Sequence, residues 1–168
     1  MAAIHIGISG WRYAPWRGDF YPKGLTQKNE LRFASRAVNS IEINGSFYAL
    51  QRPERYAEWY EQTPDDFVFS VKAPRFITHV KRLRDIEGPL ANFFASGLFA
   101  LKGKLGPLLW QFPPSFRFDP ERCEAFLARL PHDTETALEL AKRCEPRMEG
   151  RILLSIDRKR HLRHAVEI

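Results

Sequence analysis

The sequence predicts an α/β fold in which a parallel sheet forms part of a TIM-type (β/α) barrel. Five short apolar segments have the composition of strands, and they cover residues 3–11, 40–48, 67–75, 106–114 and 163–168. Segments with helical spacing lie between them, and strands that alternate with helices favour a parallel sheet. A complete barrel of this class needs about 250 residues and rarely fewer than about 200. For 168 residues we expect one incomplete barrel domain, with about the first five strands present and the last ones missing.

Alternation with a period of two divides each strand into an apolar face and a more polar one. The apolar face comprises Ile4, Ile6, Ile8, Ile41, Ile43, Phe67, Phe69, Val71, Leu108, Trp110 and Phe112. The other face mixes small and polar residues, as the interior of a barrel does near its rim. We therefore expect helices to cover the apolar face and the polar face to line the interior.

Helical patterns fill most of the intervening sequence. They cover residues 27–38, 53–62, 89–101 and 137–144, and a further helix follows Asp119, which has the sequence of an N-cap because Pro120 and Glu121 come next. The segment 132–160 is the least regular part of the chain, and within it residues 152–156 fit either a strand or a helix end.

Polar groups stand at the ends of four of the predicted strands, and they are Glu42 with Asn44, Lys72, Gln111 and Glu167. The carboxyl ends of parallel strands meet at one edge of a sheet, where ligand sites form in α/β proteins. These side chains are therefore expected at one mouth. Alternatively, each charge simply ends its strand in solvent.

Glu42, Lys72 and Glu167 are the candidate catalytic residues. Two carboxylates and a lysine suit general acid and base chemistry if their surroundings separate their pKa values, and the carboxylates could instead hold a divalent cation. The structural alternative is an internal Glu–Lys–Glu bridge that braces the barrel. No histidine pair has the spacing of zinc ligands, and the sequence leaves the identity of any cofactor open.

Candidate binding residues surround the same mouth, and they are Ser9, Trp11, Asn44, Phe47, Tyr48, Arg75, His79 and Gln111. The aromatic members follow the first two strands and would form walls around a charged floor, as suits sugars, nucleosides or stacked bases. The alternative is that these rings only cover the top of the core.

The chain is basic, with a formal charge of +6 and a pI of about 9.5. One group of positive residues follows the third strand and contains Lys72, Arg75, Lys81, Arg82 and Arg84; a second contains Arg158, Lys159, Arg160 and Arg163. The first group would favour a phosphate-bearing ligand or a nucleic-acid backbone, although a solvated basic face is the simpler interpretation.

No apolar run approaches the roughly 20 residues of a membrane span, and no signal peptide is visible. Cys123 and Cys144 form no disulfide or metal pattern. We therefore expect a cytoplasmic protein with no membrane partner.

Several motifs together resemble one known family. They are residues 7–11, 16–22, 38–48, 69–75, 77–79, 105–116 and 163–167. In order and approximate spacing they are similar to the YecE-like family, known as domain of unknown function 72. The resemblance implies a TIM-type barrel without an assigned biochemical function. Two departures are the absence of the run of arginine, histidine, proline, serine and tryptophan that follows the last glutamate in the family, and the divergent segment 132–161.

The sequence is compatible with two functions and with a third interpretation in which the chain has no activity. The first is binding of a phosphorylated or sugar-containing small molecule at the mouth, with acid–base or metal-assisted chemistry. The second is a non-catalytic nucleic-acid-binding module that uses the basic rim and the aromatic residues. The third is an inactive truncated fragment.

Overall fold

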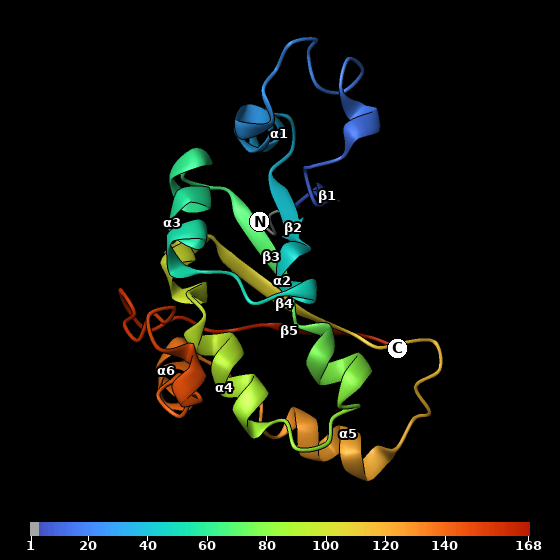
Figure 1. Ribbon diagram of the computed structural model, residues 1–168, viewed down its shortest axis with the longest axis vertical. Helices are drawn as coiled ribbons and strands as arrows, with labels where there is room; N and C mark the ends of the chain where they lie inside the picture. The colour runs from blue at the N-terminus through green and yellow to red at the C-terminus, as the bar shows by residue number, and fades with distance from the viewer. Residues whose placement is uncertain (1–3) are drawn as a thin grey trace.

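The fold is built on five parallel strands, here described from a computed structural model that covers residues 4–168 (Figure 1). The strands are β1 (Gly7–Ser9), β2 (Ser40–Ile43), β3 (Val68–Lys72), β4 (Leu105–Gln111) and β5 (His164–Glu167). They lie side by side in the order β1-β2-β3-β4-β5, and every neighbouring pair is parallel. The prediction of a parallel α/β sheet is confirmed. Within the described residues the sheet is open, with β1 and β5 at its two edges.

The helices follow the strands in alternation. They are α1 (Glu30–Ala37), α2 (Gly45–Tyr48), α3 (Pro53–Gln62), α4 (Glu87–Ala95), α5 (Pro120–Leu127) and α6 (Thr134–Ala141). Short 3-10 turns cover Ala14–Trp16, Gln27–Asn29, Leu98–Lys104 and Pro146–Met148, and one π-helical turn covers Phe76–Val80. Within residues 4–168, no helix combines the length and apolar character that a membrane crossing requires.

The core lies on one face of the sheet, as alternation predicts. Ile41, Phe69, Val71 and Trp110 are almost fully buried there. Phe93 of α4 and Phe126 of α5 pack edge-on against the Trp110 ring, with centroids 5.9 and 5.1 Å away. Burial of such large rings supplies most of the stabilisation of a small domain. The helices of Figure 1 are thus fixed to the sheet by its apolar side chains.

The first strand departs from this pattern. Ile4 and Ile6 were expected on the covered apolar face, but they are 78% and 69% exposed. The reason is their position: the strand begins at Gly7, and the preceding residues extend along the edge of the sheet, where Asn39 hydrogen-bonds Ile4 and Ile6 by its side-chain amide. Ile4 and Ile6 precede β1 and therefore lie outside the part of the apolar face that the core covers.

Two helices and one further segment differ from the sequence prediction. The helix expected over 89–101 is split after α4 because Gly97 adopts φ 115°, and a Cβ there would lie 2.5 Å from the Cα of Pro53. The helix expected over 137–144 begins earlier, at Thr134, because Asp133 accepts a hydrogen bond from the amide of Thr136. Residues 152–156 form neither a strand nor a helix.

A buried lysine fixes the end of α3. Lys104 is 2% exposed, and its ammonium donates hydrogen bonds to the carbonyls of Tyr60 and Thr63 at 2.6 and 2.8 Å and lies 4.2 Å from the Tyr60 ring centre. These carbonyls belong to the last turn of the helix, where backbone acceptors lack intrahelical partners. Burial lowers the pKa of Lys104, while nearby carboxylates, led by that of Asp65, oppose the effect. The residue therefore caps α3 from the segment that enters β4.

Replacing this cap should destabilise the fold. Lys104→Met leaves the two carbonyls without their charged donor, and we expect the free energy of unfolding to fall by about 2–3 kcal/mol in urea denaturation. Lys102→Met is the matched control, because Lys102 also lies over Tyr60, at 5.0 Å, but is exposed. Equal losses in the two variants would show that the contact with the ring, and not the cap, is responsible.

His164 joins β5 to the core in its neutral form. Trp110 Nε1 donates to His164 Nδ1 at 3.0 Å, so Nε2 carries the proton and donates to the carbonyl of Pro131 at 2.8 Å. Burial lowers the pKa of His164, the bond to Pro131 partly opposes this, and the neighbouring His132 and His161 lower it further. A second proton would have to sit on Nδ1, facing the Trp110 donor.

Acid should therefore weaken the fold through this residue. Because the folded pKa is below the unfolded value of about 6.5, the contribution of neutral His164 is complete above about pH 6.5 and is lost as the pH falls toward the folded pKa. Urea denaturation followed by tryptophan fluorescence should show this loss as the pH is lowered below about 7. It should shrink in His164→Gln and persist in His5→Gln, which alters an exposed imidazole. An unchanged pH dependence in His164→Gln would contradict this assignment.

Candidate functional site

Three of the predicted site residues form one hydrogen-bonded group at the carboxyl ends of β1 and β2. Ser9 Oγ donates to Glu42 Oε1 at 2.8 Å, and Asn44 Nδ2 donates to Ser9 Oγ at 2.7 Å. Ser9 and Glu42 are register partners on adjacent parallel strands, so their side chains leave the same face of the sheet. Gly10 follows with φ 73° and turns the chain away from the strand. The serine hydroxyl thus orients both a carboxylate and an amide.

A second group lies at the ends of β4 and β5. Gln111 Nε2 donates to Glu167 Oε1 at 2.9 Å, and the two residues are register partners. The two carboxylates proposed as a catalytic pair, Glu42 and Glu167, therefore have separate partners on opposite sides of β3. They share a sheet edge, and each is oriented by a neighbouring strand.

Lys72 ends β3 between these groups. Glu42 pairs in register with Ser70, and Lys72 lies two residues further on, so Lys72 and Glu42 project from the same face. Within the described residues Lys72 has no carboxylate within 4.0 Å; its ammonium lies 4.9 Å from the centre of the Phe47 ring. The Glu–Lys–Glu bridge considered from the sequence is thus not formed among residues 4–168, and the lysine charge has no anionic partner there.

A cationic rim surrounds the end of β3. We use this term for Lys72, Arg75, His79 and Arg82. The imidazole of His79 packs edge-on against Phe47 with 5.1 Å between ring centres, and Thr78 Oγ1 lies 2.9 Å from His79 Nδ1. Burial, followed by the positive charges of Arg75, Lys72 and Arg82, lowers the pKa of His79. Lys72, Arg75 and Arg82 therefore create a positive potential that favours an anion and the neutral form of the His79 imidazole.

An aromatic pocket of about 530 Å³ opens at the ends of β1 and β2. Ser9, Trp11 and Asn44, all predicted from the sequence, line it. Sequence reasoning missed the residues that complete it, which are Arg12, Gln51, Arg55 and Trp59. Arg55 and Trp59 lie four residues apart on α3, and this spacing on one helix face is the signal that could have identified them.

Contacts with the core fix the residues that form the wall of this pocket. Trp11 is 8% exposed and packs edge-on against Trp59 at 5.2 Å, so it belongs both to the core and to the pocket lining. Its carbonyl accepts a 2.5 Å hydrogen bond from the Tyr21 hydroxyl. Further along the same loop, Arg17 pairs with the buried carboxylate of Glu30 at 2.7 Å. The loop after β1 is thus tied to the core at two points, and the pocket is preformed.

The remaining predicted rings lie apart from this pocket. Phe47 and Tyr48 line a smaller cavity of about 190 Å³ with Phe76 and Ile77. Tyr48 is 73% exposed, whereas Phe47 is buried between Lys72 and His79. The aromatic walls expected from the sequence are therefore distributed over two cavities.

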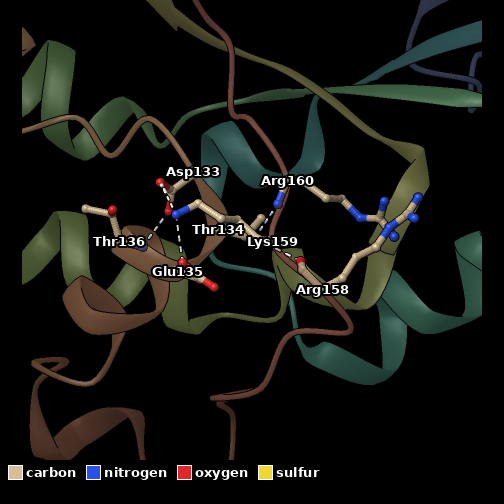
Figure 2. Close-up of polar contacts among 7 residues, drawn as sticks. All are labelled: Asp133, Thr134, Glu135, Thr136, Arg158, Lys159 and Arg160. Carbon is tan, nitrogen blue, oxygen red and sulfur yellow. Dashed lines mark hydrogen bonds and ion pairs between the residues drawn. The ribbon is translucent and has the colours of Figure 1, made fainter.

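Two members of the second basic group of the sequence, Lys159 and Arg160, are paired with acidic neighbours, and Figure 2 shows the contacts of Lys159. Lys159 Nζ lies 2.8 Å from Glu135 Oε2 and 3.3 Å from Asp133 Oδ2, and Arg160 pairs with Asp157. The backbone amide of Arg160 donates to Thr134 Oγ1 at 3.0 Å. These contacts fasten the first turn of α6 to residues 157–160, which explains the group as a structural feature.

A metal centre has no support in this geometry. Among residues 4–168, no group of three or more histidine, cysteine, aspartate or glutamate side chains is placed to hold a metal ion. Cys123 and Cys144 are free thiols.

Comparison with known proteins identifies the family. Residues 5–145 match the model of a family described as "Protein of unknown function DUF72". The protein YecE of Escherichia coli K12 is 32% identical over 140 residues, which cover 82% of this chain and 48% of YecE. YunF of Bacillus subtilis is 31% identical over 151 residues, covering 83% of this chain and 51% of YunF. The chain therefore spans about half the length of these relatives.

Solved structures of DUF72 family proteins are also similar to this chain. A DUF72 family protein of Thermotoga maritima is 27% identical and superposes with a TM-score of 0.62, covering 81% of this chain and 51% of its own. A DUF72 protein of Enterococcus faecalis, at 20% identity and a TM-score of 0.61, shares the fold. The motif resemblance found at residues 163–167 lies beyond the matched range, whereas all the other motifs fall within it. This chain belongs to the DUF72 family.

Proposed function

We propose that this protein binds a phosphorylated or sugar-containing small molecule at the carboxyl end of its sheet, as part of a (β/α) barrel. The observation that carries the proposal is the aromatic pocket, in which Trp11 and Trp59 adjoin the guanidinium groups of Arg12 and Arg55 and the polar groups of Ser9 and Asn44. Flat rings accept the apolar faces of a sugar, and arginine matches phosphate geometry. A pocket of about 530 Å³ has the volume of a small-molecule site.

In this proposal Glu42 and Glu167 supply acid–base capacity and the cationic rim attracts the anion. The hydrogen bond from Ser9 fixes Glu42 Oε1, which leaves the other carboxylate oxygen available for a ligand hydroxyl. Lys72 has no acidic neighbour within 4.0 Å in the described part of the chain, so its charge is available for a ligand anion. Because its pKa is lowered, a neutral His79 beside it is suited to accept a proton from the ligand.

The pocket can be tested through Arg55. A panel of sugar monophosphates, their parent sugars and inorganic phosphate is first ranked by the rise in melting temperature. Calorimetric titration with the best member should then show a Kd at least about tenfold higher for Arg55→Gln, because a charge-assisted hydrogen bond of about 1.5–3 kcal/mol is lost. Arg52→Gln, on an exposed arginine just before α3, is the matched control and should bind like the wild type. Equal weakening in both variants, or no stabilisation by any member of the panel, would contradict the pocket assignment.

Lys72→Met separates ligand binding from a bracing role. Lys72 contacts a ring and no carboxylate, so we expect the unfolding free energy to fall by only about 0.5–1 kcal/mol, the value of a partly exposed cation–π contact. The stabilisation of the wild type by phosphate should disappear, and Lys28→Met, on an exposed lysine, should retain it. A loss of about 3–5 kcal/mol that does not depend on phosphate would indicate a buried ion pair instead.

A further inference from the structure

A second concave surface lies between the loops that follow β3 and β4, and it shares no lining residue with the aromatic pocket. We call it the basic groove and define it by Lys81, Arg82, Arg84, Arg117, Phe118 and Arg122. Its volume is about 850 Å³. We propose that the basic groove binds the phosphate backbone of a single-stranded nucleic acid, with Phe118 stacking on one base. This inference goes beyond the small-molecule function proposed above, and of the residues that define the groove Arg82 alone also belongs to the cationic rim.

Charge is the first observation. Five cationic side chains line the groove against two carboxylates, those of Asp85 and Asp119, so this surface carries about half of the net charge of +6. Arg122 is paired with Asp119 at 2.9 Å. In residues 4–168, Lys81, Arg84 and Arg117 have no carboxylate within 4.0 Å. Unlike Lys159, whose ion pair with Glu135 is drawn in Figure 2, these three cations are available to phosphates.

Loop structure holds these charges on the surface. Leu83 and Ile86 are buried, whereas Arg82, Arg84 and Asp85 between and beside them are exposed. Arg82, Leu83 and Asp85 adopt positive φ of 48, 66 and 48°, which is unfavourable for residues with a Cβ and is kept only where the surroundings impose it. Arg82 Nη2 donates to Ser115 Oγ at 3.0 Å and joins the two loops. The groove is therefore built from two connected loops.

An exposed ring favours a base over a bare anion. Phe116 packs on Phe112 with 4.5 Å between ring centres and anchors the loop after β4. Phe118, two residues later, is 64% exposed beside Arg117. Aromatic rings that adjoin a positively charged groove bind single strands by stacking, and stacking requires an unpaired base. Arg82 also belongs to the cationic rim, so the positive surface continues from the groove to the end of β3.

The test is fluorescence anisotropy of this chain with a short labelled oligothymidylate, over a range of salt concentrations. Three available cations predict a slope of log K against log salt of about −2, since each phosphate contact on a single strand contributes about −0.7. In the double variant Arg84→Gln/Arg117→Gln we expect binding at least about tenfold weaker and a slope reduced by about 1.4. The control Arg52→Gln/Arg151→Gln removes the same charge from exposed sites outside the groove and should keep the wild-type slope. Equal weakening by both double variants would overturn the site.

Phe118→Ser tests the stacked base separately. It should weaken oligothymidylate binding several-fold and leave binding of inorganic polyphosphate unchanged. If Phe118→Ser changes neither, or if a duplex of the same length binds as tightly as the single strand, the nucleic-acid assignment is wrong. All the substituted side chains are exposed, so thermal unfolding of each variant should match the wild type. Because the groove variants leave Arg12, Arg55 and Trp59 intact, sugar phosphate binding in the same samples reports independently on the aromatic pocket.

Discussion

One face of the sheet is apolar and buried, and the other carries small and polar side chains. The rest of this structure depends on that difference. Phe69, Val71 and Trp110 are buried on one face, where Phe93 of α4 and Phe126 of α5 pack on Trp110, because these side chains stand on alternate positions of parallel strands. The intervening positions must then point the other way. Ser9, Glu42, Lys72, Gln111 and Glu167 occupy them, so the force that forms the core also gathers polar groups at one edge.

Within that edge, hydrogen bonding divides the polar residues into groups. Ser9 connects Glu42 to Asn44, and Gln111 connects to Glu167, while Lys72 between them contacts only an aromatic ring within the described chain. A carboxylate that is oriented by a neutral donor and a lysine without an acidic partner both retain capacity for a ligand. In a Glu–Lys–Glu salt bridge, these charged groups would instead be paired with one another.

The two basic groups show why charge alone is a weak guide to binding. Both look alike in the sequence. Lys159 forms ion pairs with Asp133 and Glu135 that fasten α6, and Arg160 pairs with Asp157. Arg84 and Arg117, in contrast, have no carboxylate within 4.0 Å in the described residues. The acidic partners of Lys159 lie more than twenty positions away in the chain, so composition within a window cannot reveal its pairing.

The pairing of β1 with β2 that brings Ser9 to Glu42 is known only from the structure. The sequence, through local alternation and the rule that strand ends meet, predicts the five strands, their parallel direction and the buried face of β2, β3 and β4. It did not determine that Ile4 and Ile6 would be exposed, because edge position depends on which strands are neighbours. Nor did it determine that Arg55 and Trp59 would wall the aromatic pocket, since α3 is placed by its distant cap at Lys104. Alternation is a property of neighbouring residues, so it can be read along the chain. The pairing of a charge and the exposure of a ring to a cavity depend on contacts between distant segments, and these contacts exist only in the folded structure.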